Sequence, residues 1–426
     1  MKLSTDVKLP TISMSGFETP MSEEENAIQH SVHLFAKNVL RPIGRELDKM
    51  TAEQVIAPGS PLYTAYFEAA KLGIDSDLLT QMPPDMAVRV ESLIGEEMGW
   101  GDGGLAISIG AAGFPLEMAK AVGNQELIDL CTGKIGCWMI THPDKGSDVT
   151  VYDVKKDWVP GVQGNKGNMF ARVGEDEIVI NGQCSAWVSN GAVAQVALAY
   201  LSADYGDGFF DSDGRPYGAA VIIPLDLPGV SRGKPLDKIG QRALPQGEIY
   251  FDNVKVPKRF AVALKENYYG NHTSAWSYAG TLMSQVWTGV ARAAFEMALA
   301  YCHERKQGGQ MLIEHQLTRY RIGEMMRRVE LCRGVARRSL AYARQTPQGH
   351  AYATASAKVT VTQEAMKVVD EAFQLFGGNG TSRDYPIEKL FRDARAALIE
   401  DGENYVLTMR LGRLVQDLYA DGWTQN

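Results

Sequence analysis

The 426-residue sequence is poor in the residues and motifs that mark several common protein classes. Five cysteines occur, and because they form no Cys-x-x-Cys pair we expect reduced thiols rather than disulfides or metal ligands. Seven histidines show no His-Glu-x-x-His or His-x-His spacing, so a metal site is not indicated. The absence of a Gly-x-Ser-x-Gly elbow and of a Gly-x₄-Gly-Lys-[Ser/Thr] loop argues against two common hydrolase classes.

Long apolar runs and excess positive charge are missing as well. The longest weakly polar run, GLAISIGAAGFPL, is too short to cross a bilayer, and the first residues lack an apolar core of signal-peptide length. The formal net charge of −8 disfavours nucleic acids and anionic membranes as partners. We therefore expect a cytoplasmic protein. Its hydrophobic fraction of 45% and charged fraction of 22% are ordinary for a globular chain.

Three regions of different sequence texture follow one another. The first is helical, with the segment SEEENAIQHSVHLFAKNVL opening on a serine and acids, a typical helix start. The second contains strand-like runs such as VALAYLSAD, YGAAVIIPL and GEIYFDNVKVP, and its Asn181-Gly182 pair predicts a hairpin turn. From about Thr273 helical periodicity returns. The prediction is an α+β, mostly α protein with a helical domain (1–136), a β domain (137–262) and a helical bundle (263–426).

One long helix is predicted within 319–344. Apolar residues recur there at steps of three and four, while arginines occupy mostly the other face. We interpret the arginine-rich face as solvated and paired with nearby acids, in preference to an anion-binding surface.

The segment FQLFGGNGTSRDYP (373–386) is the first that points to a ligand. By itself it is a helix that ends at paired glycines. Glycines also allow backbone N–H groups to approach a phosphate or ring closely, because no Cβ intervenes. Without further context the helix end is the simpler interpretation.

Five segments together supply that context. QLFGGNGTSRDYPIEKLFRDAR resembles the C-terminal signature of the acyl-CoA dehydrogenase family, and ERKQGGQMLIEHQ resembles that family's ERKxFGxxLxEHQ segment. MITHPDKGSDV, INGQCSAWVSNG and IGQRALPQGEIYFDNVKVP resemble three motifs of its β domain. They occur in the family's order across roughly residues 20 to 415, which makes the combination specific.

The resemblance implies a fold and an activity. The fold would comprise an N-terminal helical domain, a middle β-barrel-like domain and a C-terminal four-helix bundle, assembled as a homotetramer with FAD between the β domain and the bundle. Members of this family remove the α-proton of an acyl-CoA thioester with a carboxylate while the β-hydride passes to flavin N5. The electrons usually leave to an electron-transfer flavoprotein.

Four residues match positions around the flavin ring. Thr141 and Ser147 match residues that hydrogen-bond the isoalloxazine edge, and Trp187 and Ser189 match the tryptophan and hydroxyl that pack on it. From composition alone, Trp187 would be interpreted as a core residue of a β hairpin.

Five further residues match the nucleotide side of the cofactor. Arg305 and Gln316 match residues that reach the FAD of a neighbouring subunit, where a guanidinium suits a pyrophosphate. Gln374, Gly377 and Gly378 match the adenine and pyrophosphate side.

The catalytic base is predicted by counting from the Arg-Asp-Ala triplet of the last motif. The family's glutamate falls on Asp401, with Gly402 at the following glycine, so the base is shorter by one methylene. The adjacent Glu400 is predicted to face solvent, because neighbouring side chains point in different directions. Removing the α-proton of a thioester needs a base strengthened by burial.

Several positions depart from the family pattern. Glu403 replaces the threonine that follows the catalytic acid and glycine, Gly308 replaces a phenylalanine, and His142 replaces a glutamate. Gly247 stands where the family has an arginine close to the acyl-CoA site. FAD is therefore better supported than the identity of the substrate.

These departures leave three alternatives. Nitroalkane oxidases share this fold and use an aspartate here, although they carry an arginine seven residues further on, where this chain has Thr408 and then Arg410. Dehydrogenases of alicyclic acyl-CoAs can take the base from an aspartate after an N-terminal helix, which makes Asp102 a candidate, but a helix cap is favoured there. The third alternative is a flavin-binding scaffold without catalysis. The small residues of GDGGLAISIGAAG suggest room for a bulky or cyclic acyl group.

Overall fold

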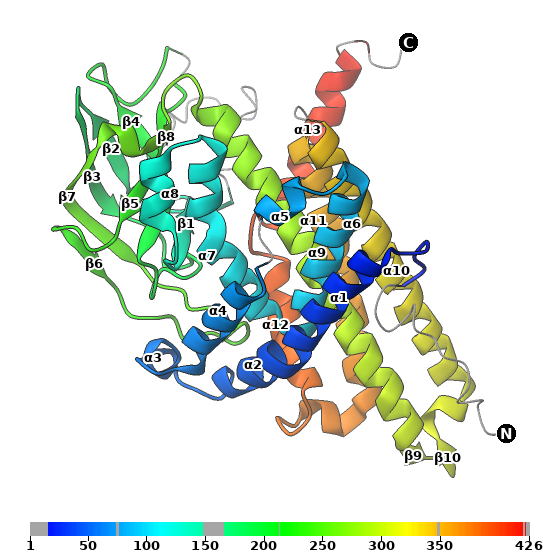
Figure 1. Ribbon diagram of the computed structural model, residues 1–426. Helices are drawn as coiled ribbons and strands as arrows, with labels where there is room; N and C mark the ends of the chain where they lie inside the picture. The colour runs from blue at the N-terminus through cyan, green and yellow to red at the C-terminus, as the bar shows by residue number, and fades with distance from the viewer. Residues whose placement is uncertain are drawn as a thin grey trace.

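The computed structural model has the three-part layout that the sequence predicts (Figure 1). It describes residues 16–73, 76–147, 166–212, 214–346, 350–420 and 422. Helices occupy the first part: α1 (Glu23–Phe35), the π-helical turn η2 (Ala36–Leu40), α2 (Arg41–Leu47), α3 (Ala52–Ile56), α4 (Pro61–Lys71), α5 (Ser76–Thr80), α6 (Pro84–Gly101), α7 (Gly103–Ala121) and α8 (Gln125–Cys131).

The helix start predicted from serine and acids is confirmed at α1. Ser22 is the N-cap: its Oγ accepts a hydrogen bond from Glu25 N (3.2 Å), and the Glu25 carboxylate accepts one from Ser22 N (2.7 Å). This reciprocal pair satisfies two backbone donors that the first turn would otherwise leave open.

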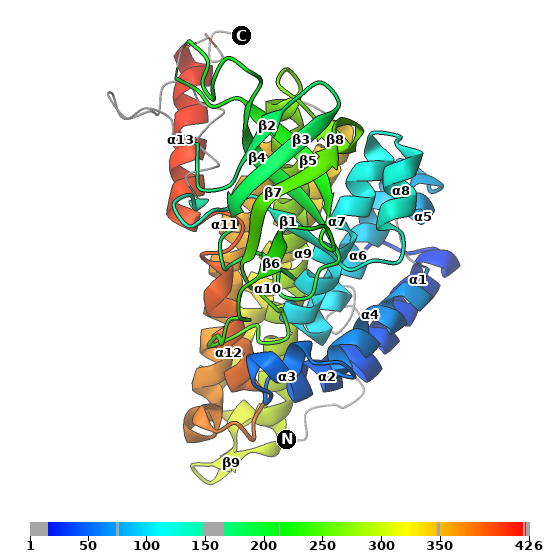
Figure 2. The ribbon, with the colours of Figure 1, turned by 90° about the vertical axis from the view of Figure 1, so that its left-hand side faces the viewer.

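A curled sheet forms the middle domain (Figure 2). Its strands are β1 (Gly136–Met139), β2 (Phe170–Val173), β3 (Glu177–Gln183), β4 (Val196–Asp204), β5 (Gly218–Pro224), β6 (Val230–Arg232), β7 (Ile249–Pro257) and β8 (Ala261–Ala263). Within the described residues the order is β6-β7-β3-β2-β4-β5-β8, with β1 paired in parallel to β4. β5 is buried along its whole length and β4 along all but its last residue, which explains their nearly continuous apolar sequences.

The hairpin predicted at Asn181-Gly182 is wrong. Both residues lie inside β3, where the pairing with β7 shifts register between Ile180 and Gly182. Gly182 has φ +102°, and a Cβ there would lie 1.9 Å from the Asn168 carbonyl oxygen. The Asn-Gly pair therefore forms a β-bulge, which uses the same glycine conformation as a tight turn.

Replacing Gly182 with alanine should destabilise the middle domain by about 2 kcal/mol or more, because the new Cβ meets backbone in a disfavoured conformation. Chemical denaturation measures the loss. Gly323→Ala, at a helical position with no heavy atom within 4 Å of an added Cβ, is the control and should be neutral or slightly stabilising. Equal stability of the two variants would contradict the bulge assignment.

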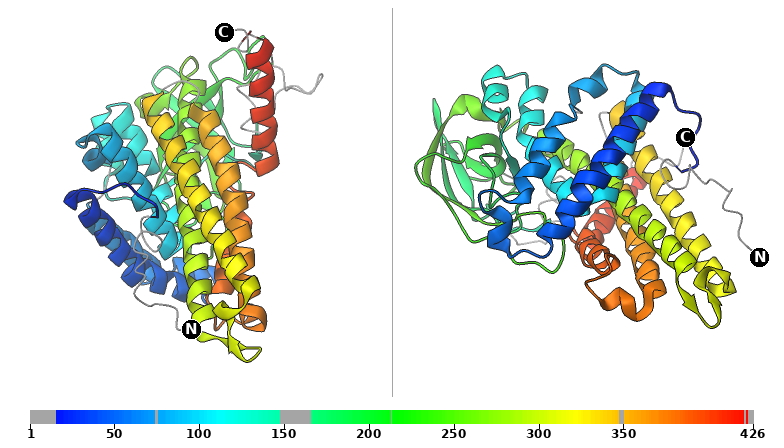
Figure 3. Two further views of the ribbon diagram at one scale, coloured as in Figure 1. Left: turned by 90° about the vertical axis from the view of Figure 1, so that its right-hand side faces the viewer. Right: turned by 60° about the horizontal axis from the view of Figure 1, so that its bottom comes forward.

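Helices form the third part, and the longest of them run side by side in Figure 3. They are α9 (Tyr268–Glu304), α10 (Gln316–Gln345), α11 (His350–Phe376), α12 (Ile387–Ala397) and α13 (Asn404–Ala420); the short strands β9 (Lys306–Gln307) and β10 (Gln310–Met311) link α9 to α10. The described residues also include the short 3₁₀ turns η4 (Lys258–Phe260), η5 (Leu312–Glu314) and η6 (Gly377–Thr381). None of the helices in the described part has the length and apolarity needed to cross a bilayer.

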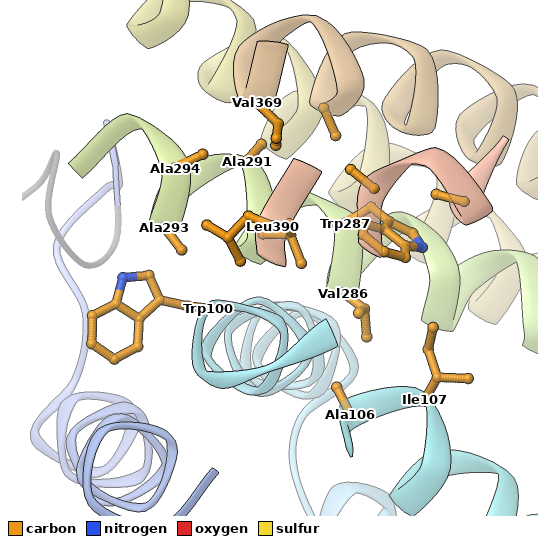
Figure 4. Packing of buried hydrophobic residues seen from close by; sticks show 14 of the residues in the cluster. Trp100, Ala106, Ile107, Val286, Trp287, Ala291, Ala293, Ala294, Val369 and Leu390 are labelled. Atoms are coloured by element: carbon orange, nitrogen blue, oxygen red, sulfur yellow. The ribbon is translucent and has the colours of Figure 1, made fainter. Parts of the chain in front are cut away.

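The 37-residue helix α9 belongs to two hydrophobic cores. Near its start, Ala275 and Trp276 pack into the core of the β domain. Further along, Val286 and Trp287 pack into the core of the helical domains, to which Trp100 of α6 also belongs (Figure 4). α9 therefore joins the sheet to both sets of helices.

A buried ionic cluster lies within this helical core. Arg292 of α9 is fully buried and bonds Glu96 (2.8 Å) and Glu97 (2.6 Å) of α6. Arg333 of α10 also reaches Glu96 (2.7 Å), and His33 of α1 contacts Glu97 (2.9 Å). The arginine-rich face of α10 is thus paired with acids as predicted, but Arg333 is buried rather than solvated.

Candidate functional site

The predicted base lies in a short acidic turn between α12 and α13. Asp401 adopts φ +49° and Gly402 φ +91°, so two successive residues are in the left-handed region. Glycine takes this conformation without strain, and aspartate tolerates it better than most residues. The Asn404 N–H donates to the Leu398 carbonyl (3.1 Å) and closes the turn.

Groups from three distant segments hold this acidic turn. Gln241, in the loop before β7, donates from Nε2 to Glu400 Oε1 (2.8 Å). The Ser147 hydroxyl, in the loop after β1, accepts the Glu403 N–H (2.9 Å). Lys358 of α11 donates from Nζ to the Gly402 carbonyl (2.8 Å). The turn is therefore fixed by the β domain on one side and by the bundle on the other.

The two adjacent carboxylates have perturbed proton affinities. Burial raises the pKa of Asp401, and the positive charge of Lys358 opposes that rise. Burial, followed by the charge of Asp401, raises the pKa of Glu400 to about 7. The expectation that Glu400 faces solvent is wrong, since its side chain is half-buried and hydrogen-bonded to Gln241.

Asp102, the alternative base, is a helix cap in the structure. Its Oδ1 accepts the Leu105 N–H (3.0 Å) at the start of α7, and its Oδ2 pairs with Lys389 of α12 (2.6 Å). Lys389 also pairs with Asp393 (2.6 Å), and all three side chains are buried. The cap interpretation is confirmed, and the charge of Asp102 is neutralised by its lysine.

The residues predicted to surround the flavin ring lie together on the β domain. Thr141 Oγ1 and Ser185 Oγ are 2.8 Å apart, and Ser185 Oγ also accepts the Trp187 N–H (3.2 Å). Ser189 forms a β-bridge with Gln246, whose amide donates to the Trp187 carbonyl (2.8 Å). The Trp187 side chain is 64% exposed, so it is not the core residue that composition suggested.

The residues predicted for the nucleotide side form a second group, at the other end of the bundle. Arg305 and Gln316 flank the β9–β10 hairpin at the bottom of Figure 1, whereas the sheet lies at the upper left. The end of α11 is adjacent to the end of α9, because Tyr301 stacks on Phe376 with ring centroids 4.1 Å apart. The members of this group are exposed: Arg305, Gln316, Gln374, Gly377 and Gly378.

The residues that depart from the family pattern have clear local roles. Glu403 accepts the N–H groups of Tyr405 (2.9 Å) and Val406 (3.1 Å), so its carboxylate caps the start of α13. His142 is buried, and its Nδ1 accepts the Met169 N–H (3.3 Å). The negative charge of Glu403 is thus already neutralised in part by backbone donors, which weakens the argument for a non-catalytic scaffold.

Three site residues were not identified from the sequence. Gln241 and Lys358 contact the acidic turn, and Asn190 ties the loop after Trp187 to α7 by accepting from Ser108 Oγ (2.7 Å). The sequence does contain a signal for Lys358, because it is the one charged residue in the stretch ATASAKVTV. Lysine is rarely buried without a partner, so a lysine in such a stretch indicates a specific contact.

Two models of one known protein family match the chain. The model of the acyl-CoA dehydrogenase middle domain matches residues 137–254, and the model of the C-terminal domain of the same family matches residues 279–416. The chain is 30% identical to glutaryl-CoA dehydrogenase of Desulfococcus multivorans over 281 residues, which is 65% of each protein. It is 29% identical to cyclohexane-1-carbonyl-CoA dehydrogenase of Geobacter metallireducens over 68% of this chain and 72% of that one.

The fold has been seen in solved structures. Butyryl-CoA dehydrogenase from Megasphaera elsdenii superposes with a TM-score of 0.78 at 22% identity, covering 94% of this chain and 100% of that one. The two family models together match more than half of the 426 residues. The chain therefore belongs to the acyl-CoA dehydrogenase family.

Proposed function

We propose that this protein is an FAD-dependent acyl-CoA dehydrogenase in which Asp401 is the base. One contact carries the proposal: the hydroxyl of Ser147, a predicted flavin-edge residue, accepts the backbone N–H of Glu403, two residues beyond Asp401. These residues are 256 positions apart in the chain, and their contact supports a predicted base that lies close to the predicted flavin edge.

The residues present fit a flavin dinucleotide. A tryptophan ring that is 64% exposed provides an apolar surface for an isoalloxazine, and Ser185 connects its backbone N–H to the Thr141 hydroxyl. At the other end, an added Cβ on Gly377 or Gly378 would meet no heavy atom within 4 Å, which leaves the backbone open to a phosphate. Bound FAD would supply a hydride acceptor at N5.

The residues predicted for the flavin ring and those predicted for the nucleotide lie far apart in one chain, which supports a homotetramer. Arg305 and Gln316 are exposed and flank the β9–β10 hairpin, at the end of the bundle away from the sheet, where they suit the nucleotide of a neighbouring subunit (Figure 1). We propose that each cofactor is shared in this way, and that electrons pass on to an electron-transfer flavoprotein.

The chain's own contribution to the reaction is proton removal. Burial raises the pKa of Asp401, which strengthens its carboxylate as an acceptor for the α-proton. Aspartate is shorter than glutamate by one C–C bond, ~1.5 Å, so the α-carbon must approach the turn more closely. A displacement of this size can change the rate greatly, and it makes the substrate class distinctive.

A bulky or cyclic acyl group is the substrate that we propose, on the strength of the likeness to the cyclohexane-1-carbonyl-CoA enzyme. The small residues at the start of α7 add little to this proposal. A Cβ on Gly103 would meet Val290 at 3.0 Å, and one on Gly104 would meet Gln241 at 3.3 Å. These glycines allow close packing rather than opening a cavity.

An oxidase of the same fold is the second candidate, because an aspartate at the base position is accompanied by a buried arginine. Arg410 of α13 is 5% exposed and lies 5.3 Å from the centre of the Tyr352 ring. The enzyme would then act on a carbon acid that is not a CoA ester.

Anaerobic mixing of the FAD-loaded protein with a panel of acyl-CoAs and nitroalkanes distinguishes these functions. We expect bleaching of the flavin band by alicyclic or branched acyl-CoAs, with slow reoxidation in air and fast reoxidation by an electron-transfer flavoprotein. Bleaching by nitroalkanes alone, with fast reoxidation in air, would establish the oxidase. A flavin that no compound bleaches would support the scaffold.

A further inference from the structure

Lys358 is a buried cation that the proposed reaction has not yet used. It lies on α11 with no exposed surface, and Nζ donates to the Gly402 carbonyl (2.8 Å) and to Asn404 Oδ1 (2.9 Å). Among the described residues no carboxylate pairs directly with this ammonium group. A buried lysine held only by neutral oxygens is rare, because desolvation of the charge is costly.

The contacts of Lys358 are those that shape the acidic turn. Gly402 is the second left-handed residue of the turn and directly follows Asp401. Asn404 begins α13, and its amide donates to Thr362 Oγ1 (3.0 Å), one helical turn beyond Lys358. Lys358 thus fixes both the carbonyl after Asp401 and the first residue of the next helix.

The charges around Asp401 give Lys358 an electrostatic role as well. Glu400 and Glu403 lie on the same turn as Asp401. The positive charge of Lys238, in the loop before β7, lowers the pKa of Glu400. Burial lowers the pKa of Lys358 to about 8, while Glu400, Asp401 and Glu403 favour its charged form. Without Lys358, the turn would lose the cation that acts on both Glu400 and Asp401.

We propose that Lys358 is a positioning residue for Asp401: it holds the turn through Gly402 and Asn404, and its charge keeps Asp401 ionised and able to accept a proton. This inference rests on the proposed function of Asp401.

Lys358→Met preserves the length of the side chain and removes the charge. Because Lys358 opposes the rise in the pKa of Asp401, its loss should raise that pKa further. We expect flavin reduction by the acyl-CoA to slow about tenfold on the acidic limb of the pH profile and to recover toward the wild-type rate as the pH rises. The acidic limb of the kcat/KM profile should move to higher pH.

The control is Lys367→Met, on the same helix, where the lysine is 55% exposed and pairs with Glu364. Its pH profile should match the wild type. Lys358→Gln, which retains a donor for the Gly402 carbonyl without the charge, is the second variant in case the methionine variant folds poorly. It should show the same shift of the acidic limb.

Hydrogen–deuterium exchange of the segment 398–407 gives a readout independent of turnover. We expect faster exchange in Lys358→Met than in Lys367→Met, with or without FAD. An unshifted pH profile with normal exchange of this segment would overturn the positioning role, whether or not the rate falls uniformly. If no acyl-CoA bleaches the flavin of the wild type, the proposed function is wrong. If an acyl-CoA bleaches the wild type and the variants behave alike, only the role of Lys358 is wrong.

Discussion

Flavin reduction by an acyl-CoA should fall by about 10²–10⁴-fold in Asp401→Asn, while FAD remains bound. Asparagine has nearly the same shape as aspartate and tolerates the same left-handed conformation, so the acidic turn should keep its geometry. The lost group is the carboxylate that accepts the α-proton. Anaerobic stopped-flow absorbance measures the rate, and the flavin-to-protein absorbance ratio confirms cofactor content.

Glu400→Gln is the matched control on the same turn. A glutamine oxygen can accept the hydrogen bond that Gln241 gives to Glu400, so we expect a rate within about tenfold of the wild type. If Glu400→Gln loses the reaction and Asp401→Asn retains it, the base is Glu400. In the wild type the rate should fall as the pH drops through the pKa of Asp401, since the protonated acid cannot accept a proton.

Arg292→Met should cost about 3–5 kcal/mol of unfolding free energy. The arginine is fully buried and pairs with Glu97. Without it, the described side chains that still contact the Glu97 carboxylate are His33 (2.9 Å) and Gln29, which donates an amide N–H (3.1 Å). An uncompensated buried carboxylate is strongly unfavourable. Denaturant unfolding at fixed pH measures the change.

The pH dependence of that loss provides a second test. In the wild type the cluster lowers the pKa of Glu97 to about 2, despite burial, chiefly through the charge of Arg292. Without the arginine, burial should raise this pKa above its unfolded value, so the variant loses stability as the pH rises through it. The deficit should therefore be larger near pH 8 than near pH 5. Arg327→Met, at a 58% exposed arginine paired with Glu324, should change stability by only about 0.5 kcal/mol.

The sequence predicted features that depend on local pattern. The start of α1 at Ser22, strands β4 and β5, and the apolar stripe that buries Met325 and Val329 on α10 follow from capping and periodicity, and all are confirmed. The Asn181-Gly182 pair shows the limit of such patterns. A positive φ at glycine serves a bulge as well as a turn, and only pairing with β7 distinguishes them.

The features that sequence analysis missed depend on contacts between distant segments. Lys358 reaches the acidic turn from 44 residues away, and Gln241 reaches Glu400 from 159 residues away. The interpretation of Glu400 as a solvent residue failed for the same reason, because its burial comes from the packing of other elements on the turn. The assignment of Asp401 as base, made from the family motif, stays a prediction.

The sharing of α9 between two cores constrains the order in which the chain can fold during synthesis. The β domain ends at Ala263, yet Ala275 and Trp276 of α9 complete its core. A nascent chain released only as far as β8 would expose the apolar surface that these residues cover. We expect the sheet to become protease-resistant on the ribosome only after the first turns of α9 have left the exit tunnel, so synthesis of the bundle would begin before the middle domain is stable.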